Sequence, residues 1–302
     1  MHDADRQDTA WLAERFEEQR PRLRAVAYRM LGSHAEAQDA VQESWMRAAR
    51  AGADDVANIG GWLTTIVARQ CLNMLRSRAS RGEEPLDVHV PDPVVSTGDG
   101  VDPASQVLLA DAVGLALLVV LESLPPSERL AFVLHDMFDV PFDQIAPIVG
   151  RTPAASRQLA SRARRRIRGA TPPPDRDLTR QHEVVDAWFT ASRGGDFNAL
   201  VALLAPDAVL RVDGGTRAAA LSKHVRGAPQ VAGQALMFAG GAWFARRAMV
   251  NGTPGAVSAR DGHVVAVMAF TIAQGRIHEI DILVDPDRLR TLPLRPQLPP
   301  LF

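Results

Sequence analysis

The stretch from Pro141 to Arg168 reads PFDQIAPIVGRTPAASRQLASRARRRIR, and its pattern predicts two short helices joined by a tight turn at Gly150-Arg151-Thr152. At about 100° per residue, one face of the second helix is apolar. That face carries Ala155, Leu159, Ala163 and Ile167, and the opposite face carries Arg157, Gln158, Ser161, Arg164, Arg165 and Arg168. No acidic residue occurs between Arg151 and Arg168. The pattern is typical of a helix-turn-helix, in which the second helix enters the major groove of DNA.

A competing interpretation is that these arginines only form a solvated helix face. Solvated faces usually mix both signs of charge so that neighbours pair at i,i+4, whereas this helix contains no anionic partner. Pro147 lies within the first helix, where proline removes an amide donor. We therefore expect that helix to start near Phe142 or Asp143 and to be short or bent.

Composition is that of a globular protein of several domains: 302 residues, 46% hydrophobic and 23% charged. The net charge of −1 means that affinity for nucleic acid must come from local basic patches. The single cysteine, Cys71, leaves no internal disulfide, and no Cys/His pattern predicts a metal site. The polar N-terminus and the lack of a long apolar run predict a cytoplasmic protein with no membrane segment. We expect no cofactor.

The chain divides into four segments. Residues 11–81 have a helical pattern, and residues 82–104 form a linker rich in proline and acidic residues. Helical pattern resumes over residues 105–170 and contains the helix-turn-helix. Pro172-Pro173-Pro174 marks a hinge, and residues 178–292 change to helices followed by strands.

In the first segment we expect helices over Phe16–Leu31, Ala35–Ala49 and Trp62–Arg78. The second has an acidic and polar face that includes Asp39, Gln42 and Glu43. The third places Trp62, Ile66, Leu72 and Leu75 on one side, with Arg69, Asn73, Arg76 and Arg78 on or near the other. One helical domain thus offers an acidic face for a protein partner and an arginine face for nucleic acid.

The last segment predicts an α+β domain with a curved antiparallel sheet. Asp261-Gly262 and Gln274-Gly275 are signals for hairpin turns. Catalysis would need a carboxylate or histidine base in an apolar cavity, for which the candidates are Asp213, His224, His278 and Asp281. Their spacing does not pair a general base with a general acid, so we expect no catalytic residue and no enzyme activity.

Three blocks of sequence resemble a known family. They are AEAQDAVQESWMRAA (Ala35 to Ala49), GGWLTTIVARQCLNMLRSRASR (Gly60 to Arg81) and the long block LPPSERL…RARRRI (Leu124 to Ile167). Their order is similar to that of extracytoplasmic function (ECF) sigma factors of bacterial RNA polymerase. DGGTR (Asp213 to Arg217) and DPDRL (Asp285 to Leu289) resemble motifs of the subgroup that carries a C-terminal SnoaL-like domain. The resemblance implies a multidomain protein, with all-α σ2 and σ4 modules followed by a cone-shaped α+β domain.

The resemblance also implies a role for each surface. The chain would direct RNA polymerase core to promoter DNA, docking on the clamp helices of the largest subunits through Asp39, Gln42 and Glu43. The −10 element would be read by Asn58, Arg69, Asn73, Arg76 and Arg78. The −35 element would be bound by Arg151, Arg157, Gln158, Ser161, Arg162, Arg164 and Arg165, some reading base edges and others holding phosphates. The C-terminal domain would regulate these activities by contacting σ2, σ4 or the linker, and the candidate contacts are Asp213, Gly214, Gly215, Arg217, Asp285, Asp287 and Arg288.

Two alternatives stay open. The chain could be a ligand-sensing helix-turn-helix regulator that binds duplex operators without being a polymerase subunit. It could also be an enzyme in which the helical part is accessory.

Overall fold

The computed structural model describes residues 2–53, 56–81, 88–96, 114–170, 174–239 and 245–292, with side chains from residue 10 onward. The chain forms two compact units. The first comprises Met1–Glu84 and Val120–Gly169, and the second comprises Pro85–Val119 and Ala170–Phe302. None of the described helices is long and apolar enough to cross a membrane.

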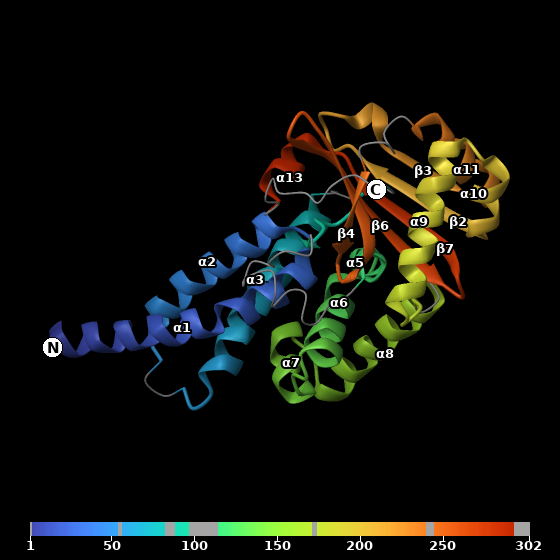
Figure 1. Ribbon diagram of the computed structural model, residues 1–302. Coiled ribbons are helices and arrows are strands. Elements are labelled where there is room, and N and C mark those ends of the chain that lie inside the picture. The colour runs from blue at the N-terminus through green and yellow to red at the C-terminus, as the bar shows by residue number, and fades with distance from the viewer. Residues whose placement is uncertain are drawn as a thin grey trace. The chain divides into compact units, whose positions relative to one another are not determined.

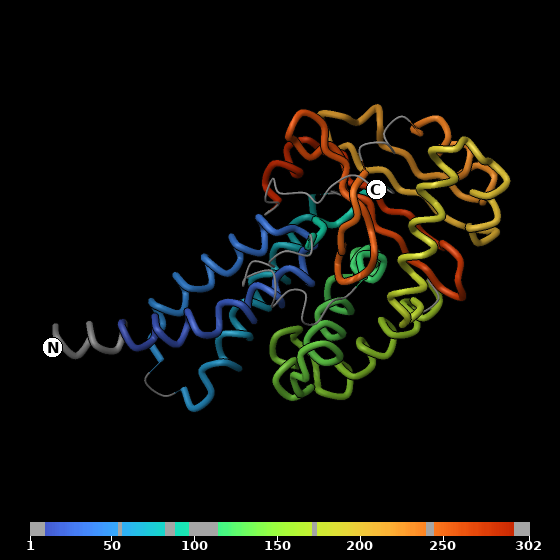
Figure 2. The backbone as a smooth tube through the Cα atoms, viewed as in Figure 1, coloured from blue at the N-terminus to red at the C-terminus, as the bar shows by residue number. Residues whose placement is uncertain are grey.

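The first unit begins with three helices that pack on one another: α1 (His2–Leu31), α2 (His34–Ala51) and α3 (Ile59–Ser80). Figure 2 shows them running alongside each other in blue. Ser33 caps α2 by accepting a hydrogen bond from the Glu36 amide, and α1 ends at Gly32, whose φ is 73°. The first helix starts earlier than expected, at His2 instead of Phe16.

The buried side of α3 differs from the expected one. Its core residues are Leu63, Thr64, Val67, Ala68, Cys71, Leu72 and Leu75. Trp62 and Ile66, which we expected on that side with Leu72 and Leu75, are only half-buried. The line through Leu63, Val67 and Cys71 is buried because small and medium side chains let α3 approach α1 and α2 closely. Burial raises the pKa of the Cys71 thiol to about 12.

The rest of this unit contains the helix-turn-helix. The boundary between the two units falls within α5 (Leu115–Glu122). The first unit continues with α6 (Pro126–Phe132) and a π-helical turn η1 (Val133–Met137). Then follow α7 (Phe142–Val149) and α8 (Pro153–Ala170). As expected, α7 starts at Phe142 and is short, at eight residues. Residues 105–113 of the expected helix from Ser105 lie outside the described residues.

A buried arginine joins the two helical parts of this unit. Arg129 in α6 donates hydrogen bonds to the Met30 carbonyl at the end of α1 (2.9 Å) and to the Glu122 carbonyl (2.5 Å). Burial lowers the pKa of Arg129 to about 10. The α3 helix also contacts α6 and α7, so the expected σ2 and σ4 modules pack together in this structure.

The second unit is a helix-backed sheet. Its helices are α9 (Leu178–Gly194), α10 (Phe197–Leu203), α11 (Ala228–Met237) and the short α13 (Pro286–Thr291), with a 3-10 turn η2 (Ala219–Leu221). Its main strands are β2 (Leu204–Asp213), β4 (Ala245–Val250), β5 (Thr253–Arg260), β6 (His263–Ala273) and β7 (Arg276–Leu283). Side chains from α9, α10 and α11 form one core with the sheet, and Figure 1 shows these helices gathered beside it.

Among the described residues, the sheet has seven strands in the order β1-β4-β5-β6-β7-β2-β3. It is mixed, whereas we expected a purely antiparallel sheet. β2 runs parallel to β7, because the chain reaches β7 only after α11 and the β4–β6 meander. β2 also pairs with the unexpected short strand β3 (Lys223–Arg226). The turn at Asp261-Gly262 has φ angles of 52° and 77°, and the turn at Gln274-Gly275 has 54° and 73°. Both hairpin turns are therefore confirmed as types that need positive φ.

The linker supplies the first strand of this sheet. Its residues Val95–Ser96 form β1, which pairs antiparallel with Val250 and Met249 of β4. Asn251, in the turn after β4, accepts a 3.0 Å hydrogen bond from the Val94 amide and donates its own amide to the Val94 carbonyl at 2.8 Å. All six residues from Val90 to Val95 are buried. Part of the segment expected as an extended linker thus forms an edge strand of the sheet.

Candidate nucleic-acid interface and linker contact

The recognition helix α8 presents an exposed basic face. Gly150 ends α7 with a φ of 70°, and Thr152 Oγ1 accepts a 3.2 Å hydrogen bond from the Ala155 amide at the start of α8. Six of the predicted polar residues on or before this helix are exposed, namely Arg151, Arg157, Gln158, Arg162, Arg165 and Arg168. The guanidinium of Arg157 also lies 5.4 Å from the centre of the Phe142 ring, which links it to α7.

The buried face of α8 is rotated from the predicted stripe. Ser156, Ala160 and Ala163 are buried, while Ala155, Leu159 and Ile167 are only half-buried. The pattern missed Ser156 because serine is polar. Its hydroxyl donates to the Thr152 carbonyl at 3.0 Å, which satisfies the group inside the helix and lets the small side chain be buried.

Several arginines of α8 do have anionic partners, although none is on the helix itself. Arg164 Nε lies 2.6 Å from Asp136 Oδ1 of η1. Glu128 of α6, whose side chain is 6% exposed, lies 3.7 Å from Arg162 and 3.6 Å from Arg166. These partners lie on other helices, so the pattern of α8 alone does not show them. Arg164 is therefore part of a structural ion pair as well as a candidate phosphate contact. Ser161, another predicted −35 residue, is half-buried.

On α3, the predicted −10 residues form an exposed row. Arg69, Asn73 and Arg76 are exposed, and their spacing places them on one face. Arg78 instead forms an ion pair with Glu36 of α2. Asn58 caps α3, because its Oδ1 accepts a 2.9 Å hydrogen bond from the Gly61 amide. Residues 54–55 of the preceding loop lie outside the described residues.

The acidic face of α2 is also accessible. Asp39 and Gln42 are exposed, and Glu43 is half-buried and 3.1 Å from Arg47 Nε. Since Glu43 and Arg47 lie one helical turn apart in solvent, their pairing is weak and a partner protein could replace it.

In the second unit, Arg288 joins the C-terminal domain to the linker. This guanidinium donates to Asp92 Oδ1 at 2.6 Å, to Asp213 Oδ2 at 2.7 Å and to the Val90 carbonyl at 2.5 Å. Asp213 Oδ2 also accepts from the Val90 amide at 3.0 Å and lies 3.3 Å from His89 Nδ1. Burial opposes ionisation of Asp213, but the hydrogen bonds from His89, Val90 and Gly215 and the charge of Arg288 hold its pKa below the usual range.

The other residues of the two C-terminal motifs surround this cluster. Asp285 Oδ1 caps α13 by accepting from the Asp287 amide at 2.9 Å. Gly215 has a φ of 58°, and a Cβ added there would lie 2.0 Å from Asp285 Oδ2. At Gly214 a Cβ would lie 2.1 Å from the Ala218 carbonyl oxygen. Arg217 pairs at the surface with Asp287, at 3.0 Å. The structure thus brings all seven predicted regulatory residues to one end of the sheet.

A second charged cluster lies on β2 and β7. Arg211 Nη1 donates to Asp281 Oδ1 at 2.7 Å and to Glu279 Oε2 at 3.0 Å. Burial disfavours the charge of Arg211, but the two carboxylates raise its pKa above the usual value. Burial raises the pKa of Asp281 and the neighbouring charge of Glu279 raises it further, although Arg211 opposes both effects.

The four candidate catalytic residues do not form a site. Asp213 is held by Arg288 and Asp281 by Arg211, while His224 is exposed and His278 is half-buried. No group of His, Cys, Asp or Glu among the described residues could hold a metal ion.

Sequence reasoning missed the linker side of the contact. The sequence pattern assigned only a linker to the segment with His89, Val90 and Asp92, and it predicted no contact for them. It also gave no role to Asn251. Asn251-Gly252 is the same kind of turn signal as Asp261-Gly262, with φ angles of 49° and 76°. The pattern VPDPVV (Val90 to Val95) mixes apolar residues with one acid, which was a possible signal for a docked segment.

Comparison with known proteins agrees with this architecture. The family model of Sigma-70 region 2 matches residues 15–81, and that of Sigma-70, region 4 matches residues 114–167. The chain is 37% identical to the ECF RNA polymerase sigma factor SigJ of Mycobacterium tuberculosis, over 93% of this chain and 94% of that protein. It is 35% identical to the probable ECF RNA polymerase sigma factor SigI of the same species, over 99% of both chains.

The fold matches as well. The crystal structure of M. tuberculosis SigJ superposes with a TM-score of 0.73 at 34% identity, covering 94% of this chain and all of that one. The C-terminal domain, with its helices packed on a mixed sheet, has an α+β fold. The chain therefore belongs to the ECF family of RNA polymerase sigma factors.

Proposed function

We propose that this chain directs RNA polymerase core to specific promoters, with α8 reading the −35 element and α3 reading the −10 element. The observation that carries the proposal is the exposed face of α8, which includes Arg157 and Gln158. Arginine and glutamine each form paired hydrogen bonds to purine edges in the major groove. A sigma factor acts together with the polymerase, so we expect it in the cytoplasm.

The residues fall into three roles in this proposal. Arg157, Gln158 and Arg162 contact bases of the −35 element, while Arg151, Arg164, Arg165 and Arg168 hold phosphates. The exposed row of Arg69, Asn73 and Arg76 on α3 follows the melted −10 strand, since cations track the backbone of single-stranded DNA. The Asn58 oxygen is used as a helix cap, so its side-chain NH2 group is the part left for a base.

Docking on the polymerase core is assigned to the exposed acidic face of α2. The test is affinity purification of core polymerase with the full chain and with Asp39→Arg. A matched control is Gln38→Arg, which adds positive charge at an exposed neighbour on a different face of the same helix. We expect Asp39→Arg to lose core binding while Gln38→Arg retains it. Equal binding by both variants would remove α2 from the interface.

We further propose that the C-terminal domain regulates the factor by holding the linker. The contacts of Arg288 with Asp92 and Val90 support this role, because they fix the segment that connects the two DNA-reading modules. A covalently attached domain acts at high effective concentration, so it needs no separate inhibitor. Run-off transcription with Arg288→Met should differ from that of wild type, and Arg290→Met, on the exposed side of α13, should not. Unchanged output from Arg288→Met would refute the regulatory proposal.

A further inference from the structure

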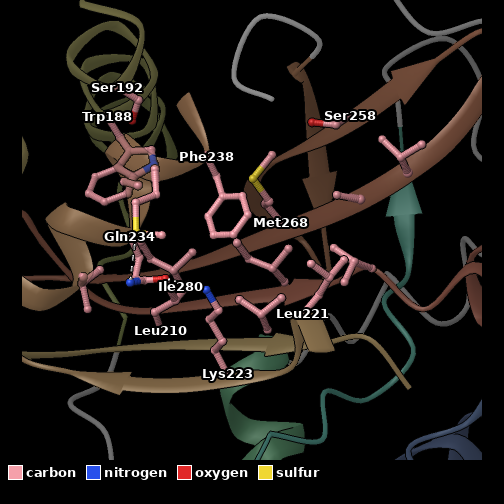
Figure 3. Close-up of a pocket in the computed structure, with 18 of the residues that line it drawn as sticks. Trp188, Ser192, Leu210, Leu221, Lys223, Gln234, Phe238, Ser258, Met268 and Ile280 are labelled. Carbon is pink, nitrogen blue, oxygen red and sulfur yellow. Dashed lines mark hydrogen bonds between the residues drawn. The ribbon is translucent and has the colours of Figure 1, made fainter. Parts of the chain in front are cut away.

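The C-terminal domain contains a cavity of about 450 Å3 between α9, α11 and the strands of the sheet. Protein sites for small molecules typically have volumes of ~300–1,000 Å3. Apolar side chains form most of its wall, including Trp188, Met268 and Ile280 (Figure 3). Several lining residues are also exposed, with Met237 at 70% and Phe238 at 52%. They mark the opening through which a ligand would enter.

A single lysine faces this cavity. Lys223 is the only lysine in the sequence, and it lies half-buried on β3. Its Nζ donates to Gln234 Oε1 at 3.0 Å and lies 4.8 Å from the centre of the Phe238 ring. Figure 3 shows the amine pointing between these side chains. No carboxylate among the described residues forms an ion pair with Lys223, so its positive charge is available to a ligand.

A second polar group in the cavity has no partner. Ser192 of α9 is 3% exposed, and its hydroxyl has no hydrogen bond among the described residues. A buried hydroxyl without a partner is unfavourable, because it has lost its hydrogen bonds to water. A polar substituent on a bound molecule would satisfy it.

The charges of the cavity indicate which ligand it takes. Its polar lining includes Lys223 and Arg260, whereas none of the described lining residues is Asp, Glu or His. The cavity is therefore positive and apolar, which favours an anion with an apolar body. It also lacks a carboxylate or imidazole to act as a general base, which favours binding over turnover.

We propose that this cavity binds a small amphipathic carboxylate, with its carboxylate on Lys223 Nζ and its apolar body against Trp188, Met268 and Ile280. The inference goes beyond the proposed function and does not depend on it, since the cavity lies wholly within the C-terminal domain.

Calorimetric titration of the full chain with decanoate tests the proposal, with 1-decanol as the uncharged match. Decanoate should bind at least about tenfold more tightly than 1-decanol, because a hydrogen bond to a charged group contributes more than a neutral one. Lys223→Met should weaken decanoate binding about tenfold or more and leave 1-decanol nearly unchanged. Arg226→Met removes a cation from the same strand at an exposed position that pairs with Asp207, so it should have no effect. Ala266→Leu, which fills the cavity, should weaken both ligands.

Acetylation of the lone lysine gives a second measurement that needs no variant. Saturating decanoate should slow acetylation of Lys223, as followed by mass spectrometry of the wild-type protein. If Lys223→Met fails to fold, this protection of Lys223 tests the proposal in its place. The proposal is overturned if decanoate neither binds nor protects Lys223. It is also overturned if 1-decanol binds equally well, or if folded Lys223→Met binds decanoate as tightly as wild type.

Discussion

The Nε atom of Arg288 in α13 donates a 2.6 Å hydrogen bond to Asp92 Oδ1, a linker residue 196 positions earlier in the chain. The same guanidinium holds Asp213, and both carboxylates are only 4% exposed. One cation thus pairs with two buried carboxylates from different segments. This contact helps to hold the linker on the sheet.

Arg288→Met should therefore release the linker. Removing one partner of a buried ion pair typically costs about 3–5 kcal/mol, because the remaining charges are left buried without compensation. We expect the Val90 amide, which donates to Asp213, to exchange with solvent at least tenfold faster. Arg290→Met is the control, since Arg290 is exposed and pairs with Asp287 at the surface. Unchanged exchange at Val90 in the Arg288 variant would contradict this account of the linker.

The backbone at Gly215 should not tolerate a side chain. An alanine there would need a left-handed backbone, at a cost of about 1–2 kcal/mol, and would also collide with Asp285. Gly262 has a similar positive φ but open space around it, so Gly262→Ala reports the backbone cost alone. Urea unfolding should show a larger loss of stability for Gly215→Ala than for Gly262→Ala. Equal losses would mean that the contact between Gly215 and Asp285 is looser than described.

The Arg211 cluster predicts a pH dependence. Burial raises the pKa of Asp281 to about 6, above the value of about 3.9 for an unfolded aspartate. The folded state therefore binds the proton more tightly, and the stability from Asp281 is lost as the pH rises from about 4 to 6. The loss in the free energy of unfolding is at most about 3 kcal/mol.

Urea unfolding of wild type and Asp281→Asn between pH 4.5 and 7 checks this sign. The stability of wild type relative to the variant should fall as the pH rises across this range. Glu183→Gln, at an exposed carboxylate of α9, should show no such trend. A relative stability that rises with pH would show that Arg211 fully compensates both carboxylates.

Substitutions of two arginines on α8 should separate the effect of this helix on DNA binding from its effect on thermal stability. Arg157 is exposed, so Arg157→Ala should weaken binding of the holoenzyme to its promoter by about 1–3 kcal/mol with little change in thermal stability. Arg164 pairs with Asp136 at 2.6 Å, so Arg164→Ala should also lower the melting temperature. Fluorescence anisotropy with labelled promoter DNA and thermal unfolding measure both effects. The assignment fails if Arg157→Ala binds normally.

Local patterns predicted much of this fold. The apolar period and the turn at Gly150-Arg151-Thr152 specify the helix-turn-helix, and two-residue turns such as Asp261-Gly262 specify the hairpins. These features depend on residues close together in sequence. The two C-terminal motifs follow β2 and β7 in the structure, and their regulatory role stays a prediction.

The rest depended on long-range contacts. Pairing of Val95 with Val250 joins segments 155 residues apart, and no local period specifies such a partner. Glu128 and Asp136 neutralise arginines of α8 from other helices, which a helical-wheel argument cannot include. Ser156 is buried because its hydroxyl bonds to the backbone within the helix, so polarity alone misplaced it. The lone lysine was visible in the sequence, but its position in a cavity followed only from the fold.

Sequencing of transcripts made in vitro from genomic DNA, by core RNA polymerase with and without the full chain, tests the central claim most directly. With the chain present, we expect transcripts to begin at discrete sites that share two upstream sequence elements, near −35 and −10. If the chain adds no start sites beyond those of core polymerase alone, its proposed action as a promoter-specificity subunit is contradicted.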